Sequence, residues 1–451
     1  MIRQVHTFAV DNPTEWKEKL LLWTQKFRAV CILDNHNYRY PGPFEASFEY
    51  LVGAESVGEF TSSEGSTFGR LEAAFEENPD WWLGGFSYDL KNELEDLRSD
   101  NTDGLHFPKA RFFVPKYLWL LKNDCLELHL REKDSVDSKK LFDELSALEI
   151  QPTSPKKAEV ESSIKWHTRI NKQSYLEKFE TIQEHIRRGD IYEMNFCREY
   201  FAEGVHLDPN SLYAELQSRT KAPFSAFWRW NSEYVLSASP ERYITKKGST
   251  VLSQPIKGTA TRSLDPVEDE RFANTLHESR KERGENVMIV DLVRNDLSKV
   301  ASKNSVEVSE LFGVYSFPTV HQLISTVQCT LNENNSWAQA IEATFPMGSM
   351  TGAPKISAMN IIESVEESAR GWYSGALGYL HPSDKEGAGR AADFDFNVII
   401  RSLIYRSDLG YLSAQVGGAI TVLSDGEEEW KETELKAKAL LAAANAAVNS
   451  K

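Results

Sequence analysis

The order of strand-like and helix-like segments constrains the fold of this chain more than any other feature. After about residue 370, the runs RGWYSGALGYL, FNVIIRSLIYR and GYLSAQVGGAITV predict three successive strands with no helix between them. A strong helical pattern, EEEWKETELKAKALLAAANAAV, follows near the C-terminus. Strands and helices therefore do not alternate strictly, which favours an α+β fold with mainly antiparallel sheets over a doubly wound parallel fold.

The central part of the chain carries further helix and strand signals. SYLEKFETIQEHIRRGD predicts a helix that ends at Gly189, a C-cap, and DIYEMNFCREYF predicts a strand directly after it. DPNSLYAELQSRT predicts a helix opened by Asp208. Helical patterns also predict a long helix at about 266–299, another near 337–344 and a third from about 355 to 367.

One segment interrupts these patterns and predicts a domain boundary. Residues 131–164 are charged and rich in serine and proline, and they include QPTSPKKAEVESS. We therefore expect an N-terminal subdomain at 1–160, with a linker at its end, and a second domain at 165–451. A chain of 451 residues is long enough to bury a core in each.

Charge and cysteine usage exclude several classes of partner and compartment. The formal charge of −16 argues against nucleic acid and anionic membranes, which attract basic faces. No apolar stretch reaches the roughly 18 residues of a membrane helix, and the N-terminal segment lacks the apolar region of a signal peptide. Cys31, Cys125, Cys197 and Cys329 are scattered, so we expect no zinc knot, no disulfide framework and a cytoplasmic location.

A lysine in an apolar setting is the first candidate for chemistry. The run PIKGTATR places Lys257 after two strand-like segments that join at Lys247–Gly248. Gly258 beside it lets backbone or ligand approach closely. A lysine whose pKa is lowered by burial can serve as a nucleophile or a base. The alternative interpretation is a surface lysine in a hairpin.

Two acidic pairs predict a cation site. Glu282 and Glu285 lie three residues apart on one helical face, and Glu429 and Glu432 repeat this spacing near the C-terminus, with Lys436 following. A divalent cation held between the two helices would turn their repulsion into attraction, and Mg²⁺ prefers such carboxylate ligands. The alternative is two ordinary solvated acidic faces.

Other polar residues interrupt apolar segments: His321, Tyr373 with Ser374, Arg401, and Gly417–Gly418. An arginine and exposed backbone N–H groups are natural binders of a carboxylate. Taken one at a time, these residues are better explained as a buried core histidine, a surface arginine and a β-bulge, and only their combination favours a binding site.

Taken together, the segments resemble the chorismate-utilising enzymes. The similarity runs in order from Tyr175 to Lys438, through GDIYEMNF (189–196), SASPERY (237–243), PIKGTATR (255–262), KERGENVMIVDLVRNDL (281–297), TVHQLISTV (319–327), FPMGSMTGAPK (345–355), RGWYSGALGYL (370–380), VGGAITVLSD (416–425) and EWKETELKAKAL (429–440). The resemblance implies an anthranilate-synthase-component-I-like fold, with antiparallel sheets packed with helices in a two-subdomain β/α sandwich. It makes 165–451 the chorismate-binding catalytic domain.

Three positions distinguish activities within that family. Lys257 stands where the anthranilate synthase large subunit usually has alanine, Asn286 where it typically has histidine, and Ser349 where threonine is an alternative. This similarity implies amination of chorismate at carbon 4 to 4-amino-4-deoxychorismate, for 4-aminobenzoate and folate biosynthesis. The alternatives are anthranilate synthase component I and a non-catalytic paralogue that only binds chorismate or a glutaminase.

The resemblance also implies roles for the site residues. Mg²⁺ would be bound by Glu285 and Glu432, with Glu282 and Glu429 in or near its inner shell through water. The residues that would bind or neutralise chorismate are Arg401, Tyr373, Gly417, Gly418, Lys436, Thr259 and Ser349.

The implied chemistry is a pair of displacements on the chorismate ring. Glu241 would be the general acid, with His321 close to the leaving hydroxyl, and Lys257 would attack ring carbon 2. Ammonia would then displace the lysine at carbon 4. Because an amine nucleophile must be unprotonated, we expect the pKa of Lys257 to be lowered, although nearby carboxylates would raise it unless Mg²⁺ neutralises them.

Ammonia needs a source, and one residue departs from the family pattern. None of the four cysteines lies in a GxCxG-like context, so we expect a separate glutamine amidotransferase subunit as partner. Glu193 stands where relatives usually have glutamine and where water-adding relatives have lysine. The missing lysine argues against isochorismate or salicylate synthase, and the role of Glu193 stays open.

Overall fold

The computed structural model describes residues 3–38, 48–62, 65–150, 164–318, 320–383 and 391–448. Its N-terminal elements are β1 Arg3–Ala9, α1 Pro13–Trp23, η1 Thr24–Lys26, β2 Ala29–Asp34, β3 Tyr50–Thr61, α2 Thr67–Glu77, β4 Trp82–Phe86, η2 Tyr88–Leu90, α3 Lys91–Leu94, β5 Ala110–Lys122, β6 Cys125–Arg131, η3 Glu132–Asp134 and α4 Ser138–Ser146.

The later elements begin after the segment expected to be a linker. They are β7 His167–Thr168, α5 Lys172–Arg188, β8 Glu193–Ala202, α6 Pro209–Thr220, β9 Phe224–Trp230, β10 Glu233–Ser239, β11 Arg242–Lys247, β12 Thr250–Ser253, β13 Ile256–Thr261, α7 Pro266–Glu278, α8 Arg280–Ser298, β14 Glu307–Ser316, β15 Val320–Thr330, α9 Trp337–Thr344, η4 Gly348–Met350, β16 Gly352–Ala353, α10 Lys355–Val365, β17 Ala376–Pro382, β18 Ala392–Val398, β19 Ser402–Arg406, β20 Tyr411–Thr421 and α11 Gly426–Val448.

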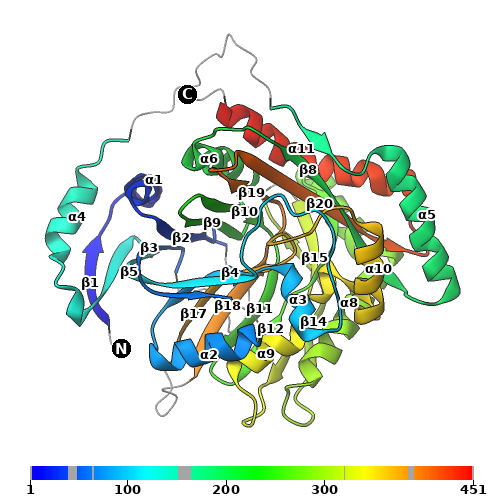
Figure 1. The fold of residues 1–451 in the computed structure, drawn as a ribbon, viewed down its shortest axis with the longest axis horizontal. Helices are drawn as coiled ribbons and strands as arrows, with labels where there is room; N and C mark the ends of the chain where they lie inside the picture. The colour runs from blue at the N-terminus through cyan, green and yellow to red at the C-terminus, as the bar shows by residue number, and fades with distance from the viewer. Residues whose placement is uncertain are drawn as a thin grey trace.

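The strands form one connected antiparallel sheet with helices packed around it (Figure 1), which confirms the α+β prediction. The described residues form twenty strands, all of which belong to the sheet, and each pairing between them is antiparallel. The sheet also crosses the expected domain boundary, because β2 pairs with β9 and β4 pairs with β17. Part of the charged segment expected to contain the linker, 151–163, lies outside the described residues, and Ser138–Ser146 within that segment form α4, so the boundary stays a prediction.

Local signals placed several elements correctly. Helix α5 ends at Gly189, which has a left-handed φ of 81°, and the Asp208 side chain caps α6 by accepting from the Ser211 N–H. The hairpin joined at Lys247–Gly248 is β11 with β12. Helix α9 spans the expected 337–344.

Two predicted elements are wrong because each is divided. The expected helix at 266–299 is α7 followed by α8. Ser279 breaks it with an extended ψ of 116°, and its hydroxyl accepts from the Glu282 N–H to begin α8. The run FNVIIRSLIYR forms β18 and β19 rather than one strand, since Arg401 between them has φ of 52°.

A compact apolar cluster fixes α11, the helix that carries the C-terminal acidic pair. Tyr175 of α5, Phe196 of β8, Ile362 of α10 and Trp430 of α11 are all buried in it. Figure 1 shows these three helices gathered beside β8 and β20. Burying each large side chain contributes about 1.5–3 kcal/mol, so the cluster anchors α11, and with it the neighbouring Glu429, against the sheet.

No helix among the described residues has the length and apolar character required to cross a membrane.

Candidate active site

A bulge in β13 positions Lys257. The pairing of β13 with β15 is irregular between Ile256 and Thr259. Gly258 at this bulge has φ of 88°, and a Cβ added there would lie 2.8 Å from Glu282 Oε2 of α8. Only glycine allows this backbone shape and this approach together. The bulge therefore brings the strand carrying Lys257 against the helix carrying the first acidic pair.

The Lys257 amine is paired with Glu193, the first residue of β8. Lys257 Nζ donates to Glu193 Oε1 at 2.5 Å, and the two residues are 8% and 1% exposed. Burial lowers the pKa of Lys257, but the charges of Glu193, Glu285 and Glu241 outweigh burial and raise it overall. This rise is the effect expected of nearby carboxylates whose charge is not neutralised, and the lowered pKa expected with Mg²⁺ bound stays a prediction.

The acidic residues of α8 and α11 meet across Lys281. Lys281 Nζ lies 4.0 Å from Glu285 Oε1 and 3.7 Å from Glu429 Oε1. Burial raises the pKa of Glu285 to about 7 and shifts those of Glu282 and Glu429 upward. These acids are therefore close enough to repel one another and are only partly compensated.

The glycines of β20 let α11 approach the sheet. A Cβ at Gly418 would lie 3.1 Å from Glu429 Oε2. Lys436 Nζ donates to the Gly417 carbonyl at 2.7 Å and lies 2.6 Å from Glu432 Oε1. Lys436 thus supplies positive charge next to the second acidic pair.

The carboxylates have the donor chemistry that a hard divalent cation requires. Among the described residues, no three His, Cys, Asp or Glu side chains come together closely enough to hold a metal ion, and the Lys281 ammonium lies between the helices. Glu285 Oε1 is nevertheless buried and has no hydrogen-bond partner in the described structure. This oxygen leaves a ligand position open, and carboxylate oxygens are what Mg²⁺ prefers.

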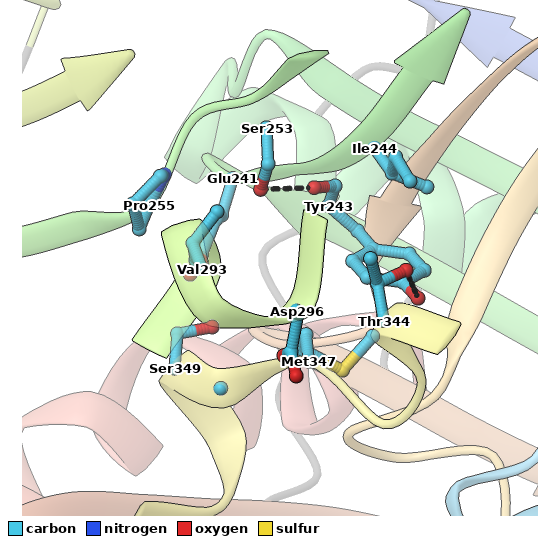
Figure 2. Close-up of a pocket in the computed structure, with 11 residues that line it drawn as sticks. Glu241, Tyr243, Ile244, Ser253, Pro255, Val293, Asp296, Thr344, Met347 and Ser349 are labelled. Carbon is cyan, nitrogen blue, oxygen red and sulfur yellow. Dashed lines mark hydrogen bonds between the residues drawn. The ribbon is translucent and has the colours of Figure 1, made fainter. Parts of the chain in front are cut away.

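Glu241 lies in a small cavity (Figure 2). The cavity, of about 20 Å³, is lined by Glu241, Ser349, Val293 and Asp296 among others. Burial raises the pKa of Glu241 to about 7, against the opposing effects of Ser349 and Lys257. A carboxyl with a pKa near neutrality is suited to proton donation.

Tyr373 and Gly417 lie beside the buried Cys197, and Arg401 lies within the electrostatic influence of Tyr373. Cys197 Sγ is 3.9 Å from the Tyr373 hydroxyl, and Cys197 is the register partner of Gly417 in the β8–β20 pair. Burial lowers the pKa of Arg401, while Tyr373 and Glu432 act in the opposite direction. These residues therefore form a polar wall that continues from the acidic helices.

Two predicted residues, His321 on β15 and Thr259 on β13, have no described hydrogen bond to Lys257 or Glu241. His321 is buried on β15, with Nε2 3.0 Å from Asp269 Oδ1 and Nδ1 2.8 Å from the Ser316 hydroxyl. Thr259 is paired with Gln322, next to His321. Asp269 and Ser316 satisfy both ring nitrogens of His321, and the catalytic role of this residue stays a prediction.

Sequence reasoning missed some of the groups that complete the site. Lys281 lies four residues before Glu285, a spacing that is also common for ion pairs on exposed helix surfaces. The sequence therefore gives no sign that Lys281 lies between two helices. Arg370 was also not predicted as a site residue. Its guanidinium donates to the Met350 carbonyl and to the Asn195 carbonyl. Glu193 differs from the glutamine that is usual in the family, but the sequence does not reveal its contact with Lys257, because the two strands that carry these residues are far apart in the sequence.

Comparison with known proteins identifies the family. The model of the chorismate binding enzyme family matches residues 29–442. Aminodeoxychorismate synthase component 1 of Escherichia coli (strain K12) is 34% identical over 359 residues, which cover 80% of this chain and 76% of that protein.

Solved structures share the fold at lower identity. Anthranilate synthase component I from Streptococcus pneumoniae TIGR4 has a TM-score of 0.73 and 24% identity over 89% of this chain and 95% of that one. MenF, the menaquinone-specific isochorismate synthase from Escherichia coli, has a TM-score of 0.73 and 16% identity over 98% and 95%. The fold, the matched family model and the sequence relative agree, and this chain belongs to the family of chorismate binding enzymes.

Proposed function

We propose that this enzyme aminates chorismate at carbon 4 to give 4-amino-4-deoxychorismate. The observation that carries the proposal is Lys257, a buried amine beside the candidate acid Glu241. An amine so placed can attack a ring carbon, which a residue with no nucleophilic atom cannot do. The name of the Escherichia coli relative, aminodeoxychorismate synthase component 1, supports the same product.

The substrate would lie between the acidic helices and the polar wall. Arg401, Tyr373 and the backbone at Gly417–Gly418 would bind the enolpyruvyl carboxylate. Glu285 and Glu432, with Glu282 and Glu429, would hold Mg²⁺. When bound, this ion would offset the charge of the ring carboxylate and withdraw electron density from the diene.

The side chains divide the chemistry between attack and departure. Lys257 would attack carbon 2 while the two ring double bonds shift toward carbon 4. Glu241 would donate its proton to the carbon 4 hydroxyl, which leaves as water. Ammonia would then attack carbon 4, the double bonds would shift back and Lys257 would leave. His321, Ser349 and Thr259 would line the leaving-group side, and Lys436 would balance the acidic residues.

Ammonia would come from a separate glutamine amidotransferase subunit. The word "component" in the name of the relative supports a two-part enzyme. We include in this proposal a cytoplasmic location and a role in supplying 4-aminobenzoate for folate synthesis.

The test is incubation of the purified protein with chorismate, Mg²⁺ and ammonium, followed by chromatographic identification of the product. We expect 4-amino-4-deoxychorismate and no anthranilate. Anthranilate fluorescence without an added lyase would instead identify an anthranilate synthase. Chorismate left unconsumed would identify a non-catalytic paralogue. EDTA should stop the reaction, and restored Mg²⁺ should recover it.

A further inference from the structure

Lys257 and Glu193 form a buried ion pair in which one carboxylate oxygen has no other described hydrogen-bond partner. Glu193 Oε1 accepts from Lys257 Nζ at 2.5 Å. The second oxygen, Oε2, is buried and has no hydrogen-bond partner among the described residues. A buried carboxylate with one free oxygen is costly for a fold unless the group has a task, since unmet buried acceptors destabilise a protein.

Three strands fix the position of Glu193. It opens β8, where its register partners are Ala353 of β16 and Thr421 of β20. Its exposed fraction is 1%, so solvent does not reach it. The carboxylate is therefore held at one place relative to the bulge that carries Lys257, and the contact is not a mobile surface ion pair.

We infer that Glu193 is the base that takes the proton from the Lys257 ammonium before attack and returns it when the lysine leaves. This inference rests on the proposed function, because it assigns a role within the covalent route. Glu193 accepts a hydrogen bond from the reacting nitrogen. The sequence alone assigned no role to this residue.

Protons and electrons balance with these groups alone. Glu193 takes one proton from Lys257, and the neutral amine forms its bond to carbon 2. The electron pairs of the two double bonds shift, and the carbon 4–oxygen bond breaks as Glu241 protonates the hydroxyl. Ammonia bonds to carbon 4 in the second step, and the carbon 2–nitrogen bond breaks to release a neutral lysine. Glu193 then returns its proton to Lys257, and Glu241 takes one from the product ammonium.

The other carboxylates facing Lys257 suit this task less well. Glu285 and Glu241 both act on the amine through their charge, and Glu282 lies against Gly258. Glu241 is needed with its proton in place to release the hydroxyl. Glu285 Oε1 lies 4.0 Å from Lys281 Nζ on the same helix, α8. Glu193 alone among these four has a described hydrogen bond to Lys257.

The inference has a distinctive pH signature. The ion pair and the neutral pair of Lys257 and Glu193 contain the same number of protons, so wild-type attack needs no proton exchange with solvent at this pair. In Glu193→Gln, Lys257 must lose its proton to solvent before it attacks. The ratio of variant to wild-type attack rate should therefore rise about tenfold per pH unit below the pKa of the lysine. The requirement for protonated Glu241 is common to both proteins and cancels in the ratio.

The experiment measures the rate of the Lys257 adduct, chorismate less one water, by quench-flow and intact-protein mass spectrometry with Mg²⁺ and no ammonia. At pH 7 we expect Glu193→Gln to be slower than wild type by about a hundredfold. Glu193→Asp keeps a carboxylate and should give a ratio that does not change with pH. Glu199→Gln removes another buried carboxylate of β8 and should also give a constant ratio.

A Glu193→Gln ratio that is constant with pH, or a variant faster than wild type, would overturn the inference. Thermal melting of each variant separates misfolding from a chemical effect. The two proposals fail separately. Wild-type protein that makes 4-amino-4-deoxychorismate from ammonia without an adduct would overturn the role of Glu193 alone. Wild-type protein that makes no such product would overturn the proposed function.

Discussion

Arg370 and Glu366 form a buried ion pair beneath the candidate site, with Arg370 Nη2 2.6 Å from Glu366 Oε1. The guanidinium also donates to the carbonyls of Met350 and Asn195, and Glu366 accepts from the Cys197 N–H. The pair thus joins β8 to η4, the turn that carries Ser349. Its partners are all buried, so neither charge is compensated by water.

Replacing Arg370 with alanine should destabilise the protein by about 3–5 kcal/mol, because Glu366 would be left buried and unpaired. The free energy of unfolding can be measured by urea denaturation followed by tryptophan fluorescence. Arg188→Ala is the matched control, since Arg188 pairs with Asp190 at the surface, and we expect no measurable loss. Equal effects of the two substitutions would contradict the structural role of the buried pair.

Gly258→Ala should impair activity more than stability. Its φ of 88° strains any other residue by about 1–2 kcal/mol, and the added Cβ would also press on Glu282 Oε2 and on Leu276. Gly189 has a similar φ of 81°, and no atom lies within 4 Å of a Cβ added there. Gly189→Ala therefore measures the backbone strain without a steric clash. We expect both variants to lose similar stability and only Gly258→Ala to lose more than about tenfold in turnover, which corresponds to 1.4 kcal/mol. Steady-state kinetics measure the turnover and thermal melts measure the stability of the two variants. Equal turnover in Gly258→Ala and Gly189→Ala would contradict the prediction.

The sequence predicted elements where local chemistry decides them. The caps at Gly189 and Asp208 and the turn at Lys247–Gly248 each depend on a few neighbouring residues, and each is confirmed. The division of the 266–299 helix was missed because Ser279 suits both a helix interior and an N-cap. Only the tertiary contacts of the two segments distinguish these roles.

The candidate site could be predicted in its residues but not in its contacts. Lys257 and Glu193 are 64 positions apart, and nothing local to either reveals a hydrogen bond between strands β13 and β8. For the same reason, the sequence predicted two opposing effects on the pKa of Lys257, from burial and from nearby carboxylates, but not which of them is larger. Burial can be inferred from apolar neighbours, whereas the carboxylates that outweigh it come from other elements.

The pH dependence of stability should identify Glu241 as a buried acid. Its pKa is raised from 4.5 to about 7, so the folded state binds its proton more tightly than the unfolded state. This stabilising contribution is complete below pH 4.5 and is lost as the pH rises through 7. Glu241→Gln cannot ionise, so its stability relative to wild type should increase between pH 5 and pH 8, by on the order of 3 kcal/mol. Urea denaturation at both pH values measures this, and a difference that does not change with pH would contradict the burial of an ionisable Glu241.

Mg²⁺ should stabilise the folded protein through the acidic helices, because a ligand that binds only the folded state raises the melting temperature with its concentration. Wild-type protein should therefore melt at increasing temperature as Mg²⁺ is titrated, without substrate present. Glu285→Gln removes the buried oxygen that has no partner and should abolish most of this shift. Glu428→Gln, on the exposed side of α11 and paired with Lys431, is the control and should keep it. Lys281→Ala should melt lower than wild type without Mg²⁺ and gain a larger shift with it, because Lys281 is the cation between Glu285 and Glu429. A shift that is the same in Glu285→Gln and wild type would place any Mg²⁺ elsewhere on the protein.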